Sequence, residues 1–296
     1  MRVLISGGTG LIGQLLKKEL ERKGHEVKIL SRSKGDYRWD IDLGVIDQHC
    51  LEGIDAIIHL AGAGIADKPW TASRKKELFN SRIVSTQLLF HLLKKQKNRV
   101  KTFISASAIG YYGADRGESL LNESSDIGKD FIGELTAQWE KESQEIEGLG
   151  IRTAQIRIGL VLTETGGYLG RVSRTIKWGI GSCLGSGKQW QSWIHYQDLL
   201  RLFLFSLENN FVRGPINGVA PQALRQEDLF KELAKQFNRP FFFPNIPEFF
   251  IKGILGELSQ VVLGSLKVSS KKLTDEWNFS FKYGNIEKAL QNILKK

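Results

Sequence analysis

The chain has 296 residues, of which 41% are hydrophobic, 25% charged and 10% aromatic, a globular composition that excludes disordered, collagen-like and coiled-coil chains. The formal net charge is +10, but the basic residues are scattered, and the densest run, over 94–101, lies where a solvated turn is expected. We therefore expect no nucleic-acid partner. The two cysteines, Cys50 and Cys183, are far apart and indicate a reducing compartment.

The sequence carries no signal for a membrane or a metal. No run of about 18 apolar residues occurs, so we expect no membrane-spanning helix. A strand pattern begins at Arg2, which leaves no room for a signal peptide. The five histidines show no metal-ligand spacing. We expect a cytoplasmic protein that binds no metal and no membrane.

The first half of the chain alternates between strand and helix patterns. A short apolar run over 2–6 predicts a buried strand, and apolar residues at helical spacing over 11–23 predict a helix that ends before Gly24. Further strands are predicted over 25–30, 55–60, 100–105 and 151–158, and helices over 70–95 and 131–148. This alternation predicts an α/β fold of Rossmann type, a doubly wound parallel sheet covered by helices on both faces.

The alternation loosens after about residue 160, where glycine-rich loops appear. Helices are predicted over 225–238 and 248–266, and a strand or turn at 279–281 precedes a short final helix. We predict a Rossmann domain over 1–160 and a smaller mixed α/β substrate lobe over 161–296. Residues 193–220 are expected to return to the first domain.

A glycine motif with the spacing Gly-x-x-Gly-x-x-Gly separates the first strand from the first helix. One glycine permits a tight turn, one lets the backbone approach a pyrophosphate, and one lets the helix pack close to the strand. The helix N-terminus offers free N–H groups to phosphates. The flanking strand and helix favour dinucleotide binding over a glycine turn without a ligand. The predicted cofactor-binding residues here are Gly7, Thr9, Gly10, Leu11, Ile12 and Gly13.

The end of the second predicted strand carries Ser31 and Arg32, the latter 19 positions after Gly13. A site specific for NAD would place an acidic residue near here to bind the ribose 2′-hydroxyl. An arginine can instead bind a 2′-phosphate bidentately, with Ser31 as a further donor. The pattern favours NADP(H), and an ordinary surface arginine is the alternative interpretation. Asp40 is suited either to contact adenosine or to cap a turn.

Further motifs accompany the glycine motif. They are His59-Leu60-Ala61-Gly62, Ser105-Ala106-Ser107, Tyr112-Gly113, Asp130-Phe131, Trp139-Glu140 and Trp193-Ile194-His195-Tyr196-Gln197-Asp198. Together they resemble the extended short-chain dehydrogenase/reductase superfamily. More narrowly, the chain resembles its atypical nucleoside-diphosphate-sugar-epimerase-like subgroup, sometimes labelled cell-division-inhibitor-like. This subgroup carries a short C-terminal domain of unknown function, which here corresponds to about 248–296.

The resemblance implies further cofactor contacts. Backbone groups beside the cofactor ribose would come from Leu60, Ala61 and Gly62. Val161 would lie near the nicotinamide, and Arg82 would lie under the active site, with Glu77 on a nearby face. The alternative interpretations are core positions for Leu60 and Val161 and an exposed ion pair between Glu77 and Arg82.

The catalytic pair typical of the superfamily, a tyrosine with a lysine four residues later, is missing. None of the six tyrosines has such a lysine, and the expected positions hold Phe131 and Leu135. Because neither side chain transfers protons, catalysis would need other groups. The resemblance implies Ser107 as a hydroxyl that polarises a substrate carbonyl, and Tyr111 lies just beyond it. The alternatives are a strand-end hydroxyl for Ser107 and packing for Tyr111, while His195 is expected to be a core or loop residue.

Three functions remain open. The first is an NADP(H)-dependent oxidoreductase or sugar-nucleotide epimerase-like enzyme that acts on an unknown small molecule, as a monomer or homodimer. The second is a non-catalytic NADP(H)-binding sensor or regulator, with a link to cell division suggested by the subgroup's label. The third is an interaction protein with a vestigial site, against which the intact glycines and Arg32 argue.

Overall fold

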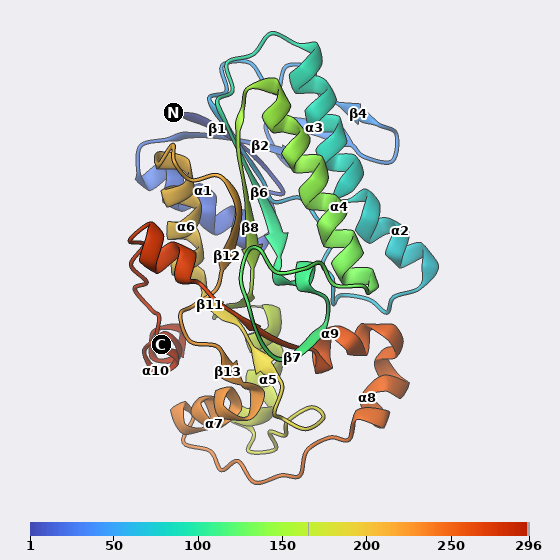
Figure 1. Ribbon diagram of the computed structural model, residues 1–296, viewed down its shortest axis with the longest axis vertical. Coiled ribbons are helices and arrows are strands. Elements are labelled where there is room, and N and C mark those ends of the chain that lie inside the picture. Colours follow the sequence, from blue (N-terminus) through green and yellow to red (C-terminus); the bar gives the residue numbers. More distant parts are fainter. Residues whose placement is uncertain (165, 295–296) are drawn as a thin grey trace. The chain divides into compact units, whose positions relative to one another are not determined.

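A mostly parallel sheet forms the centre of the fold. The computed structural model describes residues 1–164 and 166–294 (Figure 1). In spatial order, the eight strands of the sheet are β12 (Gly214–Gly218), β8 (Arg152–Ile158), β6 (Thr102–Ala108), β5 (Ala56–His59), β1 (Arg2–Ser6), β2 (Glu26–Ser31), β3 (Tyr37–Asp40) and β4 (Val45–Ile46). The pairings from β6 through β5, β1 and β2 to β3 are parallel, and β3 and β4 pair antiparallel.

Helices cover both faces of this sheet. In Figure 1, α1 (Leu11–Arg22) and α6 (Tyr196–Glu208) lie over one face, and α3 (Ile83–Lys95) and α4 (Phe131–Glu145) lie over the other. The shorter helix α2 (Ala72–Asn80) precedes α3, and the 3₁₀ turn η2 (Ile146–Leu149) follows α4. Parallel strands with helices on both faces confirm the predicted Rossmann-type fold.

The other elements include three two-stranded sheets. Their strands are β7 (Asp115–Leu121) with β14 (Ser265–Val268), β9 (Leu160–Leu162) with β11 (Trp193–His195), and β10 (Trp190–Gln191) with β13 (Leu224–Arg225). The helices and helical turns are η1 (Ile109–Tyr112), α5 (Gly167–Lys177), α7 (Gln226–Gln236), α8 (Glu248–Leu255), η3 (Gly256–Leu258), α9 (Ser259–Leu263), η4 (Lys272–Glu276) and α10 (Ile286–Leu294).

Two compact units alternate along the chain. The first unit consists of 1–108, 135–156 and 200–215. The second unit consists of 109–134, 157–199 and 216–296. The strands β8 and β12 begin in the first unit and end in the second.

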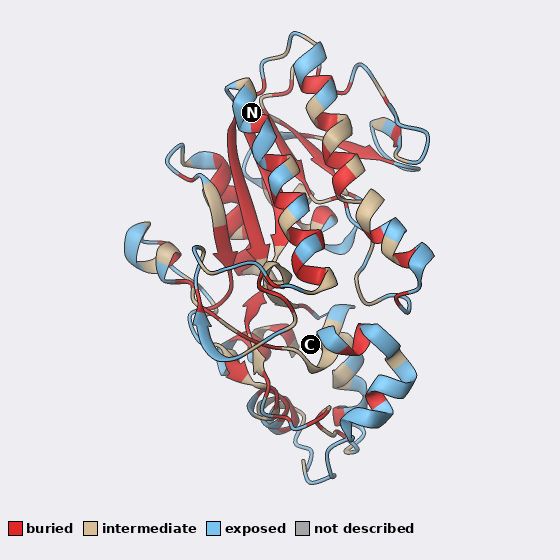
Figure 2. Cartoon of the chain, turned by 45° about the vertical axis from the view of Figure 1, so that its right-hand side comes forward, coloured by how far each residue is buried: buried red, intermediate tan, exposed pale blue. Residues whose placement is uncertain are grey.

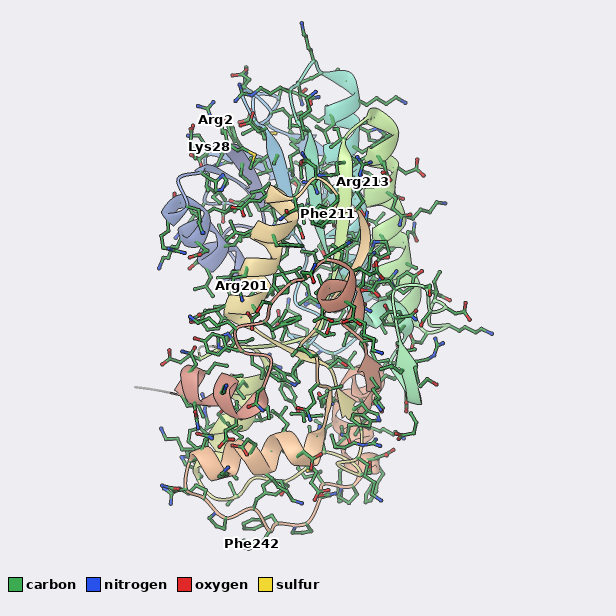
Figure 3. All side chains as sticks on the ribbon, turned by 60° about the vertical axis from the view of Figure 1, so that its left-hand side comes forward. Arg2, Lys28, Arg201, Phe211, Arg213 and Phe242 are labelled. Carbon is green, nitrogen blue, oxygen red and sulfur yellow. The ribbon has the colours of Figure 1, made fainter. Side chains whose placement is uncertain are left out.

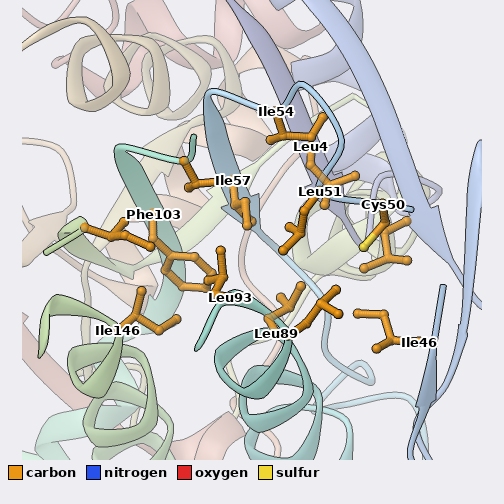
Figure 4. Close-up of a cluster of buried hydrophobic side chains, with 14 of the residues drawn as sticks. Leu4, Ile46, Cys50, Leu51, Ile54, Ile57, Leu89, Leu93, Phe103 and Ile146 are labelled. Atoms are coloured by element: carbon orange, nitrogen blue, oxygen red, sulfur yellow. The ribbon is translucent and has the colours of Figure 1, made fainter. Parts of the chain in front are cut away.

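The core of the first unit lies between the sheet and α3. Leu4 of β1, Ile57 of β5 and Leu89 of α3 pack together there (Figure 4). Figure 2 shows the same pattern, because the strands are buried while the helices are buried on one side and exposed on the other. Cys50 belongs to this core, and burial raises its pKa to about 12, so it packs as an apolar group and is not a reactive thiol.

The single helix predicted over 70–95 is wrong, because the structure has two helices there. α2 ends at Asn80 and α3 begins at Ile83. At the break, the Ser81 hydroxyl donates to the Leu78 carbonyl (3.1 Å) and accepts from the Ala63 N–H (3.0 Å). Hydrogen bonds to a distant loop thus override the helical pattern of the sequence.

Two other predicted elements are also shorter. The helix expected over 248–266 is divided into α8, η3 and α9. The helix α8 ends at Leu255, and its C-cap Gly256 has a φ of 54°, in the left-handed region that ends helices. The strand β14 follows directly. The segment 279–281 contains no strand. The predicted helix over 131–148 ends at Glu145 and continues as the 3₁₀ turn η2.

The described residues contain neither a candidate membrane span nor a candidate metal cluster. Within 1–164 and 166–294, no helix is long and apolar enough to cross a membrane. In the same part of the chain, no group of three or more His, Cys, Asp and Glu side chains is placed to hold a metal ion.

Candidate cofactor site and catalytic residues

The loop between β1 and α1 is shaped by its glycines. Gly7 has a φ of 73°, in the left-handed region that favours glycine, and a Cβ there would lie 2.7 Å from the carbonyl carbon of Leu60. A Cβ on Gly13 would lie 2.5 Å from the carbonyl oxygen of Gly7. The protein's own packing therefore requires both glycines, because the chain after β5 and the first turn of α1 approach the loop so closely.

Gly10 differs from these two glycines. Its φ of −75° suits any residue, and a Cβ there would meet only the Gly7 carbonyl oxygen, at 3.4 Å. Gly10 is the N-cap of α1, whose first turn carries no acidic side chain and whose first N–H groups lack helical partners. This open helix end fits the pyrophosphate of a dinucleotide. Thr9 and Leu11 are exposed beside Gly10, and Ile12 is half-buried.

The strand β2 ends at Ser31 and leads directly to Arg32. The Ser31 hydroxyl donates to the Lys34 carbonyl oxygen (2.5 Å) and accepts from the Lys34 N–H (2.9 Å). Its hydroxyl hydrogen is therefore used within the turn. Ser31 is buried and shapes the loop, whereas Arg32 is exposed at the end of the strand.

A cavity of about 430 Å³ lies beside Arg32. This volume is within the range of small-molecule and cofactor sites. Asp40, in the cavity wall, accepts hydrogen bonds from the N–H groups of Asp42 and Leu43, both at 3.0 Å, and so caps the turn after β3. The wall also includes Trp39 and Ile41 from this hairpin and Ser73, Lys76, Glu77 and Asn80 from α2.

Glu77 forms its ion pair with Arg74, one turn earlier on α2. The Arg74 guanidinium is 6% exposed and donates to the Glu77 carboxylate at 2.6 Å. This hydrogen bond is the main cause of the lowered pKa of Glu77, to which the charges of Lys68 and Arg32 also contribute. Glu77 is therefore ionised beside the cavity, where its carboxylate can only accept hydrogen bonds.

His59, at the end of β5, forms a buried hydrogen-bond network. Its Nδ1 lies 2.6 Å from the Ser6 hydroxyl, and its Nε2 lies 3.0 Å from the Thr86 hydroxyl. Because Thr86 donates its hydrogen to the Arg82 carbonyl (2.6 Å), Nε2 of His59 must carry the proton and Nδ1 must accept. Burial lowers the pKa of His59 to about 3, so the ring is neutral. The network links β5 to β1 and α3.

Arg82 holds the loop that follows His59. Its guanidinium donates to the carbonyl oxygens of Leu78 (3.2 Å) and Ala63 (3.0 Å), and its Cζ lies 5.2 Å from the centre of the Trp139 ring. A Cβ on Gly62 would lie 3.2 Å from the same Cζ. Burial lowers the pKa of Arg82 to about 10, which leaves it charged at neutral pH. The exposed ion pair considered for Arg82 is therefore wrong.

Ser107 lies at the end of β6 and is joined to a residue that the sequence analysis missed. Its hydroxyl donates to a carboxylate oxygen of Glu140, on α4, at 2.5 Å. Both side chains are 3% exposed. Ser107 thus contacts a proton acceptor, and the alternative of a hydroxyl bonded only to backbone is wrong. Glu140 was visible in the sequence only as part of the Trp139-Glu140 motif.

The second unit contains the tyrosine pair and Val161. The Arg157 guanidinium lies 3.4 Å from the centre of the Tyr111 ring and donates to the Tyr112 hydroxyl at 2.9 Å. Tyr112 also donates to Asn217 (2.7 Å), and burial raises its pKa to about 12, so it serves packing. Tyr111 is only half-buried. Val161 lies in β9, paired with β11.

His195 is a core residue of the second unit, as expected. Its ring centre lies 4.0 Å from that of Tyr283 and 4.7 Å from that of Tyr196. Its Nδ1 accepts from the N–H of Gln197 at 3.1 Å. Burial lowers its pKa to about 4. A neutral ring stacked between aromatic side chains serves packing.

Comparison with known proteins identifies the family. The profile of the NAD dependent epimerase/dehydratase family matches residues 3–217. The chain belongs to this family. A domain of unknown function, DUF1731, matches 246–293, which confirms the predicted C-terminal domain of the subgroup.

Relatives within this epimerase family match the chain from end to end. The epimerase family protein YfhF of Bacillus subtilis is 35% identical over 302 residues, which cover 99% of this chain and 98% of that protein. The epimerase family protein SA0724 of Staphylococcus aureus is 36% identical over 299 residues, with the same coverage. The crystal structure of human epimerase family protein SDR39U1 with NADPH superposes with a TM-score of 0.90, at 31% identity and 99% coverage of both chains.

This epimerase-family chain has apolar residues at the start of α4. Phe131 is the first residue of the helix, and Leu135, one turn later, is buried. The tyrosine and lysine of the superfamily are expected at these two positions. The fold is therefore that of an NAD(P)-binding epimerase, but any proton transfer has to use other side chains.

Proposed function

We propose that the protein binds NADP(H) through the glycine loop and Arg32. The observation that carries this proposal is the position of Arg32, an exposed cation that lines a cavity at the end of β2, where an NAD-specific site would have an acid. The open space at Gly10 supports the proposal, because it leaves the N-terminus of α1 accessible to a pyrophosphate. The NADPH in the structure of the human relative also supports it.

The proposed reaction is that of an oxidoreductase or sugar-nucleotide epimerase acting on a small molecule. Bound NADP(H) would supply hydride transfer. Ser107 and Tyr111 are the proposed proton-handling groups. Ser107 can accept a proton from a substrate hydroxyl while its own hydrogen passes to the Glu140 carboxylate, so the pair can hold the proton that an alcohol loses on oxidation. We propose a cytoplasmic monomer or homodimer whose partner is the small molecule.

A second candidate function is a non-catalytic NADP(H) sensor or regulator, including the regulation of cell division suggested by the subgroup's label. The apolar Phe131 and Leu135 favour it, because neither can replace the tyrosine and lysine. An enzyme should consume or produce NADPH with a carbonyl, alcohol or nucleotide-sugar substrate. A sensor should bind NADPH with no turnover of any of them.

The experiment that tests the proposal is calorimetric titration of the purified protein with NADPH and with NADH. Tight binding that is selective for NADPH is the expected result, and it would justify a substrate screen under hydride-transfer conditions. Binding of neither cofactor would contradict the proposal and favour a vestigial site.

A further inference from the structure

Two cations line the cavity beside β2 without an ion pair, although the charge of Arg32 acts on Glu77. Arg32 comes from the end of β2 and Lys76 from α2. Across 1–164 and 166–294, neither forms an ion pair with a carboxylate. Two of the three acidic residues in the same wall are engaged, since Glu77 pairs with Arg74 and Asp40 accepts two backbone N–H groups. The third, Asp42, is exposed.

Some other basic side chains of the first unit are paired. Arg2, labelled in Figure 3, contacts Glu26 at 2.8 Å. Arg213, also labelled there, lies 3.6 Å from a carboxylate oxygen of Glu147. What distinguishes Arg32 and Lys76 is that both line one cavity without such a pair. Their combined charge is suited to an anion that enters the cavity.

The position of Lys76 on α2 follows from the helical repeat. Ser73, Lys76 and Asn80 recur at spacings of three and four, so they share one face of the helix, and all three line the cavity. Lys75 lies one residue away, about 100° around the helix, and is not part of the wall. The Thr71 side chain caps the start of α2 by accepting from the Arg74 N–H at 3.1 Å.

A phosphate monoester carries a charge of about −1.5 to −2 at neutral pH. A single arginine neutralises only part of that charge, whereas two cations match it. We propose that Lys76 is the second cation for the adenosine 2′-phosphate, opposite Arg32, and so determines the preference for NADP(H) over NAD(H). This inference rests on the proposed function and assigns the 2′-phosphate site to two elements, β2 and α2.

The test uses the full chain and four purified forms: wild type, Lys76→Gln, Lys76→Arg and the control Lys75→Gln. Each is titrated calorimetrically with NADPH, NADH and adenosine 2′,5′-bisphosphate. Lys76→Gln is expected to weaken the binding of NADPH and of the bisphosphate roughly tenfold, the usual effect of losing one charge-assisted hydrogen bond. Its affinity for NADH should be unchanged. Lys76→Arg should restore most of the affinity. Lys75→Gln removes the same charge from the same helix and should change the affinity for neither cofactor.

Two outcomes would overturn the inference, and they can be told apart. If wild type prefers NADPH but Lys76→Gln keeps the same NADPH-to-NADH affinity ratio, Lys76 is not a phosphate ligand and the proposed function survives. If wild type shows no preference for NADPH, both the inference and the proposed cofactor fail. Because Lys76 is exposed and unpaired, its substitution should leave the melting temperature unchanged. That measurement excludes misfolding as the cause of weaker binding.

Discussion

The glycines of the nucleotide loop are required for different physical reasons. Gly7 and Gly13 are required by contacts within the protein, so their substitution would disturb the fold itself. Contacts within the protein do not require Gly10, because a Cβ there meets only one atom, at 3.4 Å. Gly10 is therefore the position at which ligand binding can be separated from folding.

The substitution Gly10→Val tests this separation. It should weaken NADPH binding by ~100-fold or more, since the added side chain blocks backbone hydrogen bonds to phosphate, each worth about 1.5–3 kcal/mol. The free energy of unfolding should change by less than about 1 kcal/mol, because Gly10 is an N-cap with an ordinary φ. Calorimetry and urea unfolding measure the two quantities. Unchanged affinity for NADPH would mean that the loop does not hold the phosphates.

Arg32 gives the second prediction at this scale. Arg32→Ala should weaken the binding of NADPH by ~1.5–3 kcal/mol through the loss of a charge-assisted hydrogen bond. The binding of NADH should be nearly unchanged. Arg38→Ala is the matched control, because Arg38 is an exposed arginine of the adjacent strand β3 outside the cavity wall. Titration with both cofactors measures the difference. An equal loss for the two cofactors would sink the assignment of Arg32 to the 2′-phosphate.

Residues of the site could be predicted from sequence only where a motif fixes their place. Arg32 was found by its distance from the glycine motif, and the position of the missing catalytic pair was found in the same way. Lys76 and Glu140 were not found as site residues, because a charged residue on a helix has no assignable role until the phase of that helix against its neighbours is known. The structure supplies that phase for α2 and α4.

At the scale of elements, the chain between β5 and α3 departs most from its sequence pattern. The pattern over 70–95 is helical throughout, but Ser81 and Arg82 bond to the loop after β5 and divide the helix. Local propensity is a weak determinant where tertiary hydrogen bonds compete with it. The division gives α2 its own direction, and α2 forms one wall of the cavity.

The His59 network predicts how the stability of these elements depends on pH. Because burial lowers the pKa of His59 to about 3, the unfolded chain binds a proton near pH 6.5 that the folded chain does not. The stabilisation from neutral His59 is therefore present above pH 6.5 and lost as pH falls toward 3. His59 alone should lower the free energy of unfolding by about 1.4 kcal/mol between pH 7.5 and pH 5.5.

The measurement is urea unfolding at both pH values for wild type and His59→Gln. The glutamine variant should be less stable at pH 7.5 but lose less stability on acidification, because it has no ring to protonate. His49→Gln is the control, since His49 is exposed and its pKa is raised by hydrogen bonding to Glu52. If wild type and His59→Gln show the same pH dependence, the ring does not titrate as described.

At the scale of the whole molecule, the sequence predicts the alternation of strands and helices but only part of how these elements group. The alternation of strands and helices is a local pattern, and it was sufficient for the Rossmann fold. The grouping depends on which distant segments pair, and periodicity carries no information about pairing partners. The segment 200–215 of the first unit lies within 193–220, which the sequence predicts to return there, whereas the assignment of 109–134 to the second unit follows from contacts that only the structure contains.

A fragment ending at residue 160 tests the importance of the returning segment. In the first unit, the buried Arg152 donates to the carbonyl oxygens of Val212 (2.7 Å) and Leu207 (3.3 Å). The fragment lacks both acceptors and leaves Arg152 only its hydrogen bond to the Thr102 hydroxyl, a loss of about 1–3 kcal/mol. It also lacks the buried side chains of α6, such as Phe203. We expect no cooperative urea transition by circular dichroism, whereas the full chain should show one.

A transition in the fragment as steep as that of the full chain would contradict this expectation. It would mean that 1–160 contains a complete core. A fragment ending at residue 215 is the control, because it restores all three segments of the first unit.

The late return of β12 also has a consequence for synthesis on the ribosome. The strand β8 is translated well before β12, its neighbour in the sheet. The roughly 55 residues between them take about 3 to 11 s to add at 5–20 residues per second. During that interval the nascent chain exposes an unpaired strand edge, a template for pairing with other chains. Slowed translation of this stretch should therefore increase the demand of the newborn chain for chaperones.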